Sequence, residues 1–389
     1  MPGASDRGTA YVSCRIHCLP ACFSRAVVAV CKLTSPAPGI PPLVSLCRYG
    51  LPGYSAQEGE AFSAAASGLH PRHQLPFVLS RVAASKAIAS LSPDKRAACP
   101  GEEDGPAVVF TDRREAAPTL HGCCLSIAHE DSAAASVAWS VPSPDSSSFK
   151  DYHAAPERLY MEAQLVCSHS TLPDATATSF AYAIDVVNVA EVHRVRSRFP
   201  HFGQRWMPQC TTTASADDVG RALTCVQKQH QECVAAVGAP GGSHGGEGVS
   251  ACQAACRRDE WWKHLVTPYV TEADAYAAVV LAQHWGVREC AVKLVGIPGR
   301  SFAYECVRAL PPRGGAVVTE STPFTASFLM SHTLYSAEVH GAEAATLAQQ
   351  RLHPLLYLYT WTEWVPLNST VDLPYVVVLA CAPCRSDAR

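Results

Sequence analysis

A few charged residues stand inside an otherwise apolar segment, QHWGVRECAVKLVGIPG (residues 283–299), in a chain with only 17% charged residues. If the segment is a helix that ends at Gly296, Trp285, Glu289 and Lys293 lie four residues apart on one face. Glu289 and Lys293 could form a solvated ion pair that stabilises only the helix. They could also present an acid and an ammonium to a ligand. The rest of the chain has to separate these two interpretations.

A second candidate is Asp185, the only charged residue in the apolar stretch SFAYAIDVV (residues 179–187). This stretch predicts a buried strand, and an unpaired buried carboxylate either costs several kcal/mol or takes up a proton. Asp185 therefore requires a cation. An arginine such as Arg194 or Arg288 could form a salt bridge with it. Alternatively, a hard metal ion could be shared between Asp185 and a second carboxylate.

Length and charge exclude several classes of protein. The chain has 389 residues, a formal net charge of −3 and a pI near 6.6, and it contains no run of lysine or arginine. We therefore expect no nucleic-acid partner. No apolar run reaches the roughly 18 residues of a membrane span, so we expect a soluble protein. Residues 1–57 hold one acid, Asp6, among basic and small residues, which is typical of a transit peptide. We expect a cytoplasmic protein, with a mitochondrial location as the alternative.

The 18 cysteines are scattered along the chain. Without a signal peptide, and with many of them in apolar stretches, we expect reduced thiols in the core. Cys14, Cys18 and Cys22 do not have the spacing of zinc or iron–sulfur sites, and Cys381 with Cys384 is a single CxxC. We expect no structural metal at either group.

The first half of the chain predicts one long helix among several strands. Apolar residues recur at helical spacing over residues 75–92, with Arg81 and Lys86 on or near one side. Pro- and Gly-rich loops precede this helix, to about residue 70. Strand patterns occupy residues 10–19, 107–112, 122–129 and 133–141. A polar turn at residues 130–132 joins the last two strands.

The second half follows a Ser-, Pro- and Asp-rich segment. We expect an N-terminal half over residues 1–140, a linker over 141–178 and a C-terminal half over 179–389. After the Asp185 strand, a helix capped by Asn188 is predicted. A low-complexity insertion that includes GAPGGSHGGEG occupies about residues 210–262. The remaining predicted elements are a helix over 271–294 and strands over 301–310 and 373–382.

Four blocks of this sequence together resemble the 4'-phosphopantetheinyl transferase superfamily. AIDVVNVAEVHRVRSRFPHFGQRWM and LAQHWGVRECAVKLVGIPG resemble its two signature blocks, approximately G-x-D-[IV]-x-x-[IV] and W-x-x-K-E-A-x-x-K-x-x-G. LSRVAASKAIASL resembles the family's early arginine-bearing helix. LHGCCLSIAHEDSAAASVAWS resembles its [NS]-x-S-H strand with the following hairpin. The resemblance covers roughly residues 75–139, 179–207 and 271–305.

The resemblance implies a fold, a reaction and a set of site residues. The fold would be α/β (α+β), with two similar halves related by pseudo-twofold symmetry in one monomer. The reaction would transfer phosphopantetheine from coenzyme A to a serine of an acyl or peptidyl carrier protein, for example in fatty acid biosynthesis. Asp185 and Glu289 would bind Mg²⁺, with Glu289 also the general base and Lys293 a catalytic cation on phosphate. Arg81, Lys86, His129 and Lys293 would contact coenzyme A.

The sequence also departs from the family pattern. Ala128 replaces the serine before the histidine, and Ala116, Ala117 and Pro118 replace a G-K-P turn. Ala183 and Arg288 replace a glycine and a lysine of the signature blocks. The changed turn and Ala128 favour the alternative of a non-catalytic member that binds coenzyme A or a carrier protein, whereas the presence of Asp185, Glu289 and Lys293 argues against it. For His129 and Arg81, the alternative roles are a turn residue and a solvated helix residue.

Overall fold

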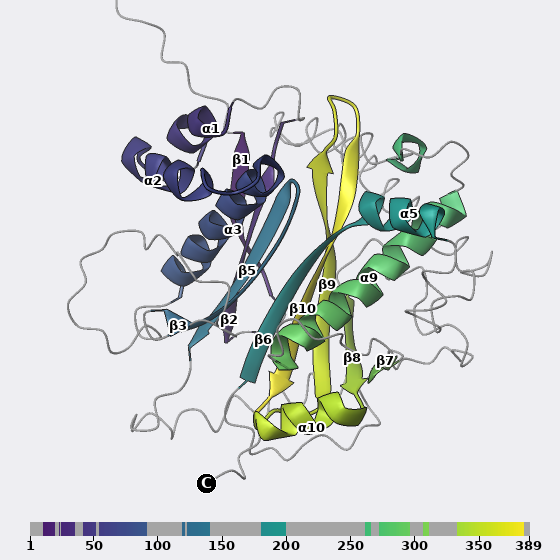
Figure 1. The fold of residues 1–389 in the computed structure, drawn as a ribbon. Helices are drawn as coiled ribbons and strands as arrows, with labels where there is room; N and C mark the ends of the chain where they lie inside the picture. The colour runs from purple at the N-terminus through teal and green to yellow at the C-terminus, as the bar shows by residue number, and fades with distance from the viewer. Residues whose placement is uncertain are drawn as a thin grey trace, which may run out of the picture.

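The structure is a computed structural model, in which two antiparallel sheets lie between helices (Figure 1). It describes residues 11–19, 23, 25–35, 42–51, 54–91, 119–120, 123–140, 180–199, 261–265, 272–295, 306–310 and 333–384. The mixed α/β class expected from the sequence is confirmed at this level.

Within the described ranges, each sheet has five strands, and all of their pairings are antiparallel. The first sheet has the order β1-β2-β5-β4-β3 and the second has the order β6-β10-β9-β8-β7. The strands of the first sheet are β1 (Val12–His17), β2 (Ala26–Leu33), β3 (Thr119–Leu120), β4 (Cys123–Glu130) and β5 (Ala133–Ser140). Those of the second are β6 (Phe180–Asn188), β7 (Val307–Leu310), β8 (Thr333–Val339), β9 (Leu355–Pro366) and β10 (Asp372–Pro383).

One long helix covers the outer face of each sheet. α3 packs on the first sheet and α9 on the second, so the layers run helix, sheet, sheet, helix (Figure 1). Each sheet together with its helices is called a unit below. In both units a strand precedes the long helix and pairs with the last strand of its sheet: β2 with β5, and β6 with β10. The helices are α1 (Leu43–Tyr49), α2 (Ala56–Ala66), α3 (Pro71–Ala89), α5 (Val189–Arg198), η6 (Trp261–His264), α9 (Glu272–Val295) and α10 (Gly341–Gln349).

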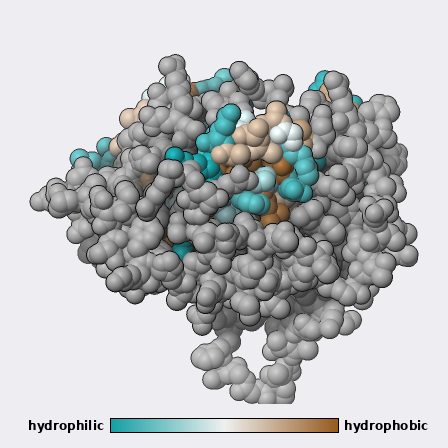
Figure 2. All heavy atoms as spheres, turned by 90° about the horizontal axis from the view of Figure 1, so that it is seen from below, coloured by the Kyte–Doolittle hydropathy of each residue, from teal (hydrophilic) through white to brown (hydrophobic). Residues whose placement is uncertain are grey.

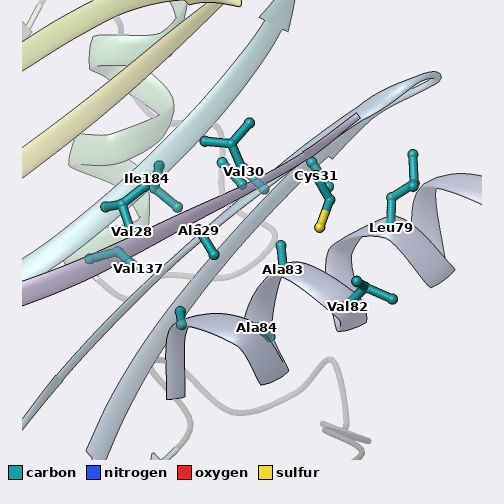
Figure 3. Close-up of a cluster of buried hydrophobic side chains, with 14 of the residues drawn as sticks. Val28, Ala29, Val30, Cys31, Leu79, Val82, Ala83, Ala84, Val137 and Ile184 are labelled. Atoms are coloured by element: carbon teal, nitrogen blue, oxygen red, sulfur yellow. The ribbon is translucent and has the colours of Figure 1, made fainter. Parts of the chain in front are cut away.

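Strand β2, which lies between β1 and β5 in the first sheet, explains why the two sheets stack. Its side chains alternate, and both of its faces are buried. Ala29 and Cys31 point toward Ala83 of α3, whereas Val28 and Val30 point toward Ile184 of β6 (Figure 3). One apolar cluster therefore joins α3, both faces of the first sheet and the inner face of the second. A second cluster fills the space between the second sheet and α9.

Most of the elements predicted from periodicity are present. The helices expected over residues 75–92, 188–199 and 271–294 correspond to α3, α5 and α9, and Asn188 caps α5 by accepting a hydrogen bond from the Ala190 amide at 3.0 Å. The region expected to be loops up to residue 70 was predicted wrongly, since it contains β2, α1 and α2. In β2, an apolar run buried on both faces lacks alternation, which hides a strand from a period-two search.

Several predictions lie outside the described residues. They are the strand over 107–112, the linker over 141–178, the turn at 116–118 and most of the insertion over about 210–262. The strand expected over 301–310 is described only from Cys306 onward, with β7 over its last four residues. The division of the chain into two halves joined by a linker over 141–178 therefore stays a prediction.

The expectation of reduced cysteines is wrong for one pair. Cys14 and Cys31 form a disulfide between β1 and β2. They are direct partners across this antiparallel pair, with Cα atoms 4.1 Å apart, so the strand register brings the two thiols together. Among the described residues, Cys18, Cys47, Cys124 and Cys290 are free thiols.

The described surface has few large exposed apolar side chains. Ile16 lies on β1, Val44 lies on α1, and Phe199 and Leu367 directly follow α5 and β9. Seen from below, the described part of the surface shows apolar side chains bordered by hydrophilic ones (Figure 2). No helix within the described ranges is long and apolar enough to cross a membrane.

Candidate functional site

One face of α9 carries the aromatic and charged residues that are spaced four apart in the sequence. Trp285, Glu289 and Lys293 are each partly exposed, while most of their neighbours on α9 are buried. The predicted sharing of one helix face is therefore confirmed. α9 ends at Val295, one residue before the predicted Gly296.

Lys293 of α9 contacts Asp185 of β6. Its Nζ lies 2.9 Å from Asp185 Oδ1 and also donates to the Ile184 carbonyl oxygen at 2.6 Å. On β6, Ile184 and Val186 face the first sheet, so Asp185 faces α9. The side chain of Asp185 is 12% exposed and that of Lys293 is 30% exposed. This pair lies at the edge of the second core, partly open to solvent.

The cation that neutralises Asp185 is therefore a lysine, and the two arginines considered from the sequence bind elsewhere. Arg194 forms an ion pair with Glu191 on its own helix. Arg288 is buried and donates to the carbonyl oxygens of His284 and Val307. Arg288 is five positions before Lys293, which turns it about 140° around the helix axis and away from Asp185.

Burial and the neighbouring charges shift the pKa values of both residues in this contact. Burial raises the pKa of Asp185 to about 6, in spite of the adjacent Lys293, and the nearby Glu289 raises it further. Burial alone would lower the pKa of Lys293, but Asp185 and other anionic neighbours outweigh burial and raise it. Lys293 thus stays protonated at neutral pH, while Asp185 is held less firmly in its charged form.

Glu130, at the end of β4, is a further acid that the sequence analysis treated only as a turn residue. Burial raises its pKa to about 7, with contributions from Asp185, Asp131 and Glu191, opposed by Lys293. Glu130 therefore lies within electrostatic reach of the Asp185–Lys293 pair, although it belongs to the other sheet. No sequence signal could have revealed this proximity, because it depends on how the two sheets stack.

His129 precedes Glu130 and is exposed at the end of β4. The predicted strand and hairpin are confirmed, with His129 paired to Ala134 in the register. The hairpin extends toward the second sheet, because the Ser126 hydroxyl accepts a hydrogen bond from the Ile184 amide at 3.3 Å. β4 and β6 thus bring His129 and Asp185 onto neighbouring strands of different sheets.

Arg81 and Lys86 lie on α3, on the outer face of the first sheet. Arg81 is 7% exposed, donates to the Ser80 hydroxyl at 3.1 Å and stacks over the Phe77 ring. The alternative of a solvated Arg81 is therefore wrong. Lys86 is exposed, so the expectation that both residues lie on one side is also wrong. Five residues correspond to about 140° of rotation, which points one inward and the other outward.

The predicted magnesium ligands, Asp185 and Glu289, can be compared with the coordination that Mg²⁺ prefers. Asp185 and Glu289 offer carboxylate oxygens, the ligand type that Mg²⁺ prefers, and Mg²⁺ commonly retains several waters beside one or two carboxylates. Burial is the main cause of the raised pKa of Asp185, and Lys293 opposes it; a metal cation beside the carboxylate would likewise favour its charged form. Within the part of the chain that is described, no three His, Cys, Asp or Glu residues form a ready metal cluster. Asp185 and Glu289 are therefore the two candidate ligands in this region.

Comparison of the chain with models of known protein families and with curated proteins finds no match.

Proposed function

We propose that this protein is a magnesium-dependent transferase that moves 4'-phosphopantetheine from coenzyme A to a serine hydroxyl of a carrier protein. The observation that carries the proposal is the contact of Lys293 with Asp185, with Glu289 one helical turn away on the same face of α9. These are the acid, cation and base of the two signature blocks. They come together although 108 positions separate Asp185 from Lys293.

The arrangement of the two units supports the same proposal. Each unit places a strand before a long helix and pairs that strand with its last strand. This repeated order agrees with the pseudo-twofold arrangement expected of a two-halved transferase. The acids and His129 lie where β4 of one unit meets β6 of the other. A coenzyme A molecule bound there would be contacted by both units.

Each side chain then has a distinct role in the reaction. Glu289 accepts the proton of the serine hydroxyl, and the serine oxygen forms a bond to the phosphorus that bears pantetheine. The bond from this phosphorus to the bridging oxygen breaks, and adenosine 3',5'-bisphosphate leaves with that oxygen. Lys293 donates hydrogen bonds to the phosphate oxygens as negative charge develops. A bound Mg²⁺, held by Asp185 and Glu289, would neutralise the pyrophosphate charge.

His129 and Arg81 have binding roles in this proposal. His129 contacts a phosphate of coenzyme A from the first unit. Arg81 contacts the 3'-phosphate, and Lys86, which points to the opposite side of α3, is assigned no role. For Arg81 this requires its guanidinium to leave its stacked position over Phe77. Arg81→Ala is therefore expected mainly to raise the KM for coenzyme A.

A non-catalytic module that binds coenzyme A or a carrier protein is the second candidate. The observation that favours it is Ala128, which is 5% exposed and offers no hydroxyl to phosphate. The retention of the costly buried Asp185 and its lysine opposes it, because a binding module has little need for a carboxylate with a raised pKa.

A labelling assay separates the two candidates. Full-length protein is incubated with an apo-carrier protein, fluorescent coenzyme A and Mg²⁺, and transfer of the label is followed over time. We expect Glu289→Ala to slow transfer by at least about 100-fold, the effect of losing a general base. The matched control Glu343→Ala on α10 should stay within about threefold of wild type. If the wild type labels no carrier but binds coenzyme A in calorimetry, the binding module is the correct function.

A further inference from the structure

Strand β6 forms one edge of the second sheet, where β10 is its only neighbour among the described strands. In an antiparallel edge strand, every second residue turns its backbone N–H and C=O away from the sheet, where they need other partners. Ile184 is such a residue. Its amide donates to Ser126 Oγ at 3.3 Å, and its carbonyl oxygen accepts from Lys293 Nζ at 2.6 Å. The first unit and α9 therefore hold the same residue of β6.

Ser126 lies on β4, on the face of the first sheet that meets β6. It is the direct partner of Val137 in the β4–β5 register, and Val137 and Ile184 belong to the same apolar cluster (Figure 3). Cross-strand partners share a face of the sheet, so the Ser126 side chain lies on the same face as Val137. The Ser136 hydroxyl donates to the Ser126 carbonyl oxygen at 3.2 Å, which ties the Ser126 backbone to β5. Ser126 is thus anchored in the first sheet while its hydroxyl binds the second.

Asp185 follows Ile184 directly, and Lys293 contacts both residues. Besides the Ile184 carbonyl oxygen, Lys293 Nζ binds Asp185 Oδ1 at 2.9 Å. The Ile184 carbonyl belongs to the planar peptide group that leads into Asp185, so a shift of β6 at Ile184 moves both acceptors relative to α9. The hydrogen bond to Ser126 holds the other backbone group of Ile184. Ser126 therefore influences the Asp185–Lys293 contact through the backbone of β6.

We infer that Ser126 is a positioning residue of the proposed transferase site, because its hydroxyl holds the segment of β6 that presents Asp185 to Lys293. The inference rests on the proposed function. Ser126 binds a backbone amide and touches no reacting atom in this role. In Ser126→Ala the Ile184 amide loses its acceptor, whereas Ser126→Thr keeps an Oγ atom on a residue type that favours strands.

A double-mutant cycle tests the coupling of Ser126 to Lys293 independently of any activity. Urea unfolding is measured for Ser126→Ala, Lys293→Met and the double variant. Because both side chains hold the same residue of β6, their effects should not be additive. The unfolding equilibrium constant of the double variant should differ by at least about threefold from the product of the two single effects.

The matched cycle uses Ser136→Ala, which removes a buried hydroxyl that bonds within the first unit. Its effect should combine with that of Lys293→Met by simple multiplication. Additivity in the Ser126 cycle, or equal coupling in both cycles, overturns the inference.

Metal binding tests the role of Ser126 at the site itself. We expect Ser126→Ala to weaken Mn²⁺ binding in the presence of coenzyme A by about fivefold, because Asp185 is then less well placed as a ligand. Ser126→Thr and Ser136→Ala should both stay within about twofold of wild type. Unchanged Mn²⁺ affinity in Ser126→Ala, or an equal loss in Ser126→Thr or Ser136→Ala, overturns the inference.

The two tests separate a failure of this inference from a failure of the proposed function. If the Ser126 cycle shows coupling but the wild type neither binds Mn²⁺ with coenzyme A nor labels a carrier protein, the proposed function fails, while Ser126 still positions the Asp185–Lys293 pair. If the wild type binds Mn²⁺ and labels the carrier, and Ser126→Ala does both equally well, the inference fails and the proposed function stands.

Discussion

Two acids of opposite sheets dominate the site at the scale of single residues. Asp185 has a pKa near 6 and Glu130 near 7, and burial is the main cause for both. Each acid is therefore more easily protonated in the folded protein than in the unfolded chain. Lys293 lowers the pKa of both acids, but by less than the other causes raise it.

The raised pKa of Glu130 predicts a pH dependence of stability. Between its unfolded pKa, about 4.5, and its folded pKa, about 7, the folded state holds a proton that the unfolded state has lost. Wild-type stability should therefore fall as pH rises through this window. Glu130→Gln cannot titrate, so its stability advantage over wild type should grow between about pH 5 and pH 8.

Urea unfolding in EDTA over this pH range would measure the advantage, with Glu343→Gln on α10 as the control. A difference between Glu130→Gln and wild type that does not change with pH would mean that Glu130 is solvated.

Sequence reasoning at this scale identified the residues better than their partners. The lone acid in an apolar strand correctly required a cation, because desolvation of Asp185 follows from its neighbours in the sequence. The sequence could not show which cation pairs with Asp185, because this depends on the rotation of α9 and on its distance from β6. Glu130 was missed for the same reason.

α9 determines the site at the scale of elements. Gly286 of α9 lies directly against the second sheet. A Cβ atom there would lie 2.6 Å from Val378 Cγ2 and 3.4 Å from Val187 Cγ2. Val378 is the partner of Asp185 across β6 and β10. Gly286 thus lets α9 lie close enough for Lys293 to reach Asp185.

Gly286→Ala is therefore expected to destabilise the protein. Overpacking costs about 1–3 kcal/mol, and the better helix propensity of alanine returns up to about 1 kcal/mol, so a net loss of about 1 kcal/mol is expected in denaturant unfolding. The cost should shrink in a Val378→Ala background, which removes the clashing methyl groups. A variant as stable as wild type would show that α9 can shift without cost.

The helices were predictable where apolar residues recur over a long stretch or where the start of the helix is marked. α5 follows a capping asparagine, and α3 and α9 have long apolar periodicity. The start of α2 carried a signal that was overlooked: Ser55 and Glu58 form a capping box before the helix. The insertion of β2 between two buried faces is a tertiary property that its run of small apolar residues does not reveal.

A buried polar cluster joins the two sheets at the scale of the whole molecule. Glu363 of β9 is 1% exposed, and its carboxylate pairs with Arg15 at 2.6 Å and Lys32 at 2.8 Å from the first sheet. Trp361 Nε1 donates to the same carboxylate at 3.0 Å, and the Trp361 ring stacks on His17. Burial raises the pKa of Glu363, but Lys32 and Arg15 outweigh it, so the pKa is lowered.

Glu363→Gln tests this contact between the sheets. Removing one partner of a buried ion pair costs about 3–5 kcal/mol, and we expect the lower value at neutral pH because Arg15 is half exposed. A lowered pKa stabilises the fold above the unfolded value of about 4.5, so the cost should shrink as pH falls below it. Thermal unfolding would measure the cost against the half-exposed control Glu338→Gln. Equal stability of both variants would contradict a role in holding the sheets together.

Asp185 and α9 belong to one unit and His129 belongs to the other. The proposed metal site can be tested directly by measuring metal binding. Mn²⁺ binding in the presence of coenzyme A, followed by electron paramagnetic resonance, should detect one site in the wild type. Asp185→Asn should weaken this binding by at least about tenfold, because it removes a charged ligand. Equal Mn²⁺ affinity in wild type and Asp185→Asn would contradict the proposed magnesium and pyrophosphate site.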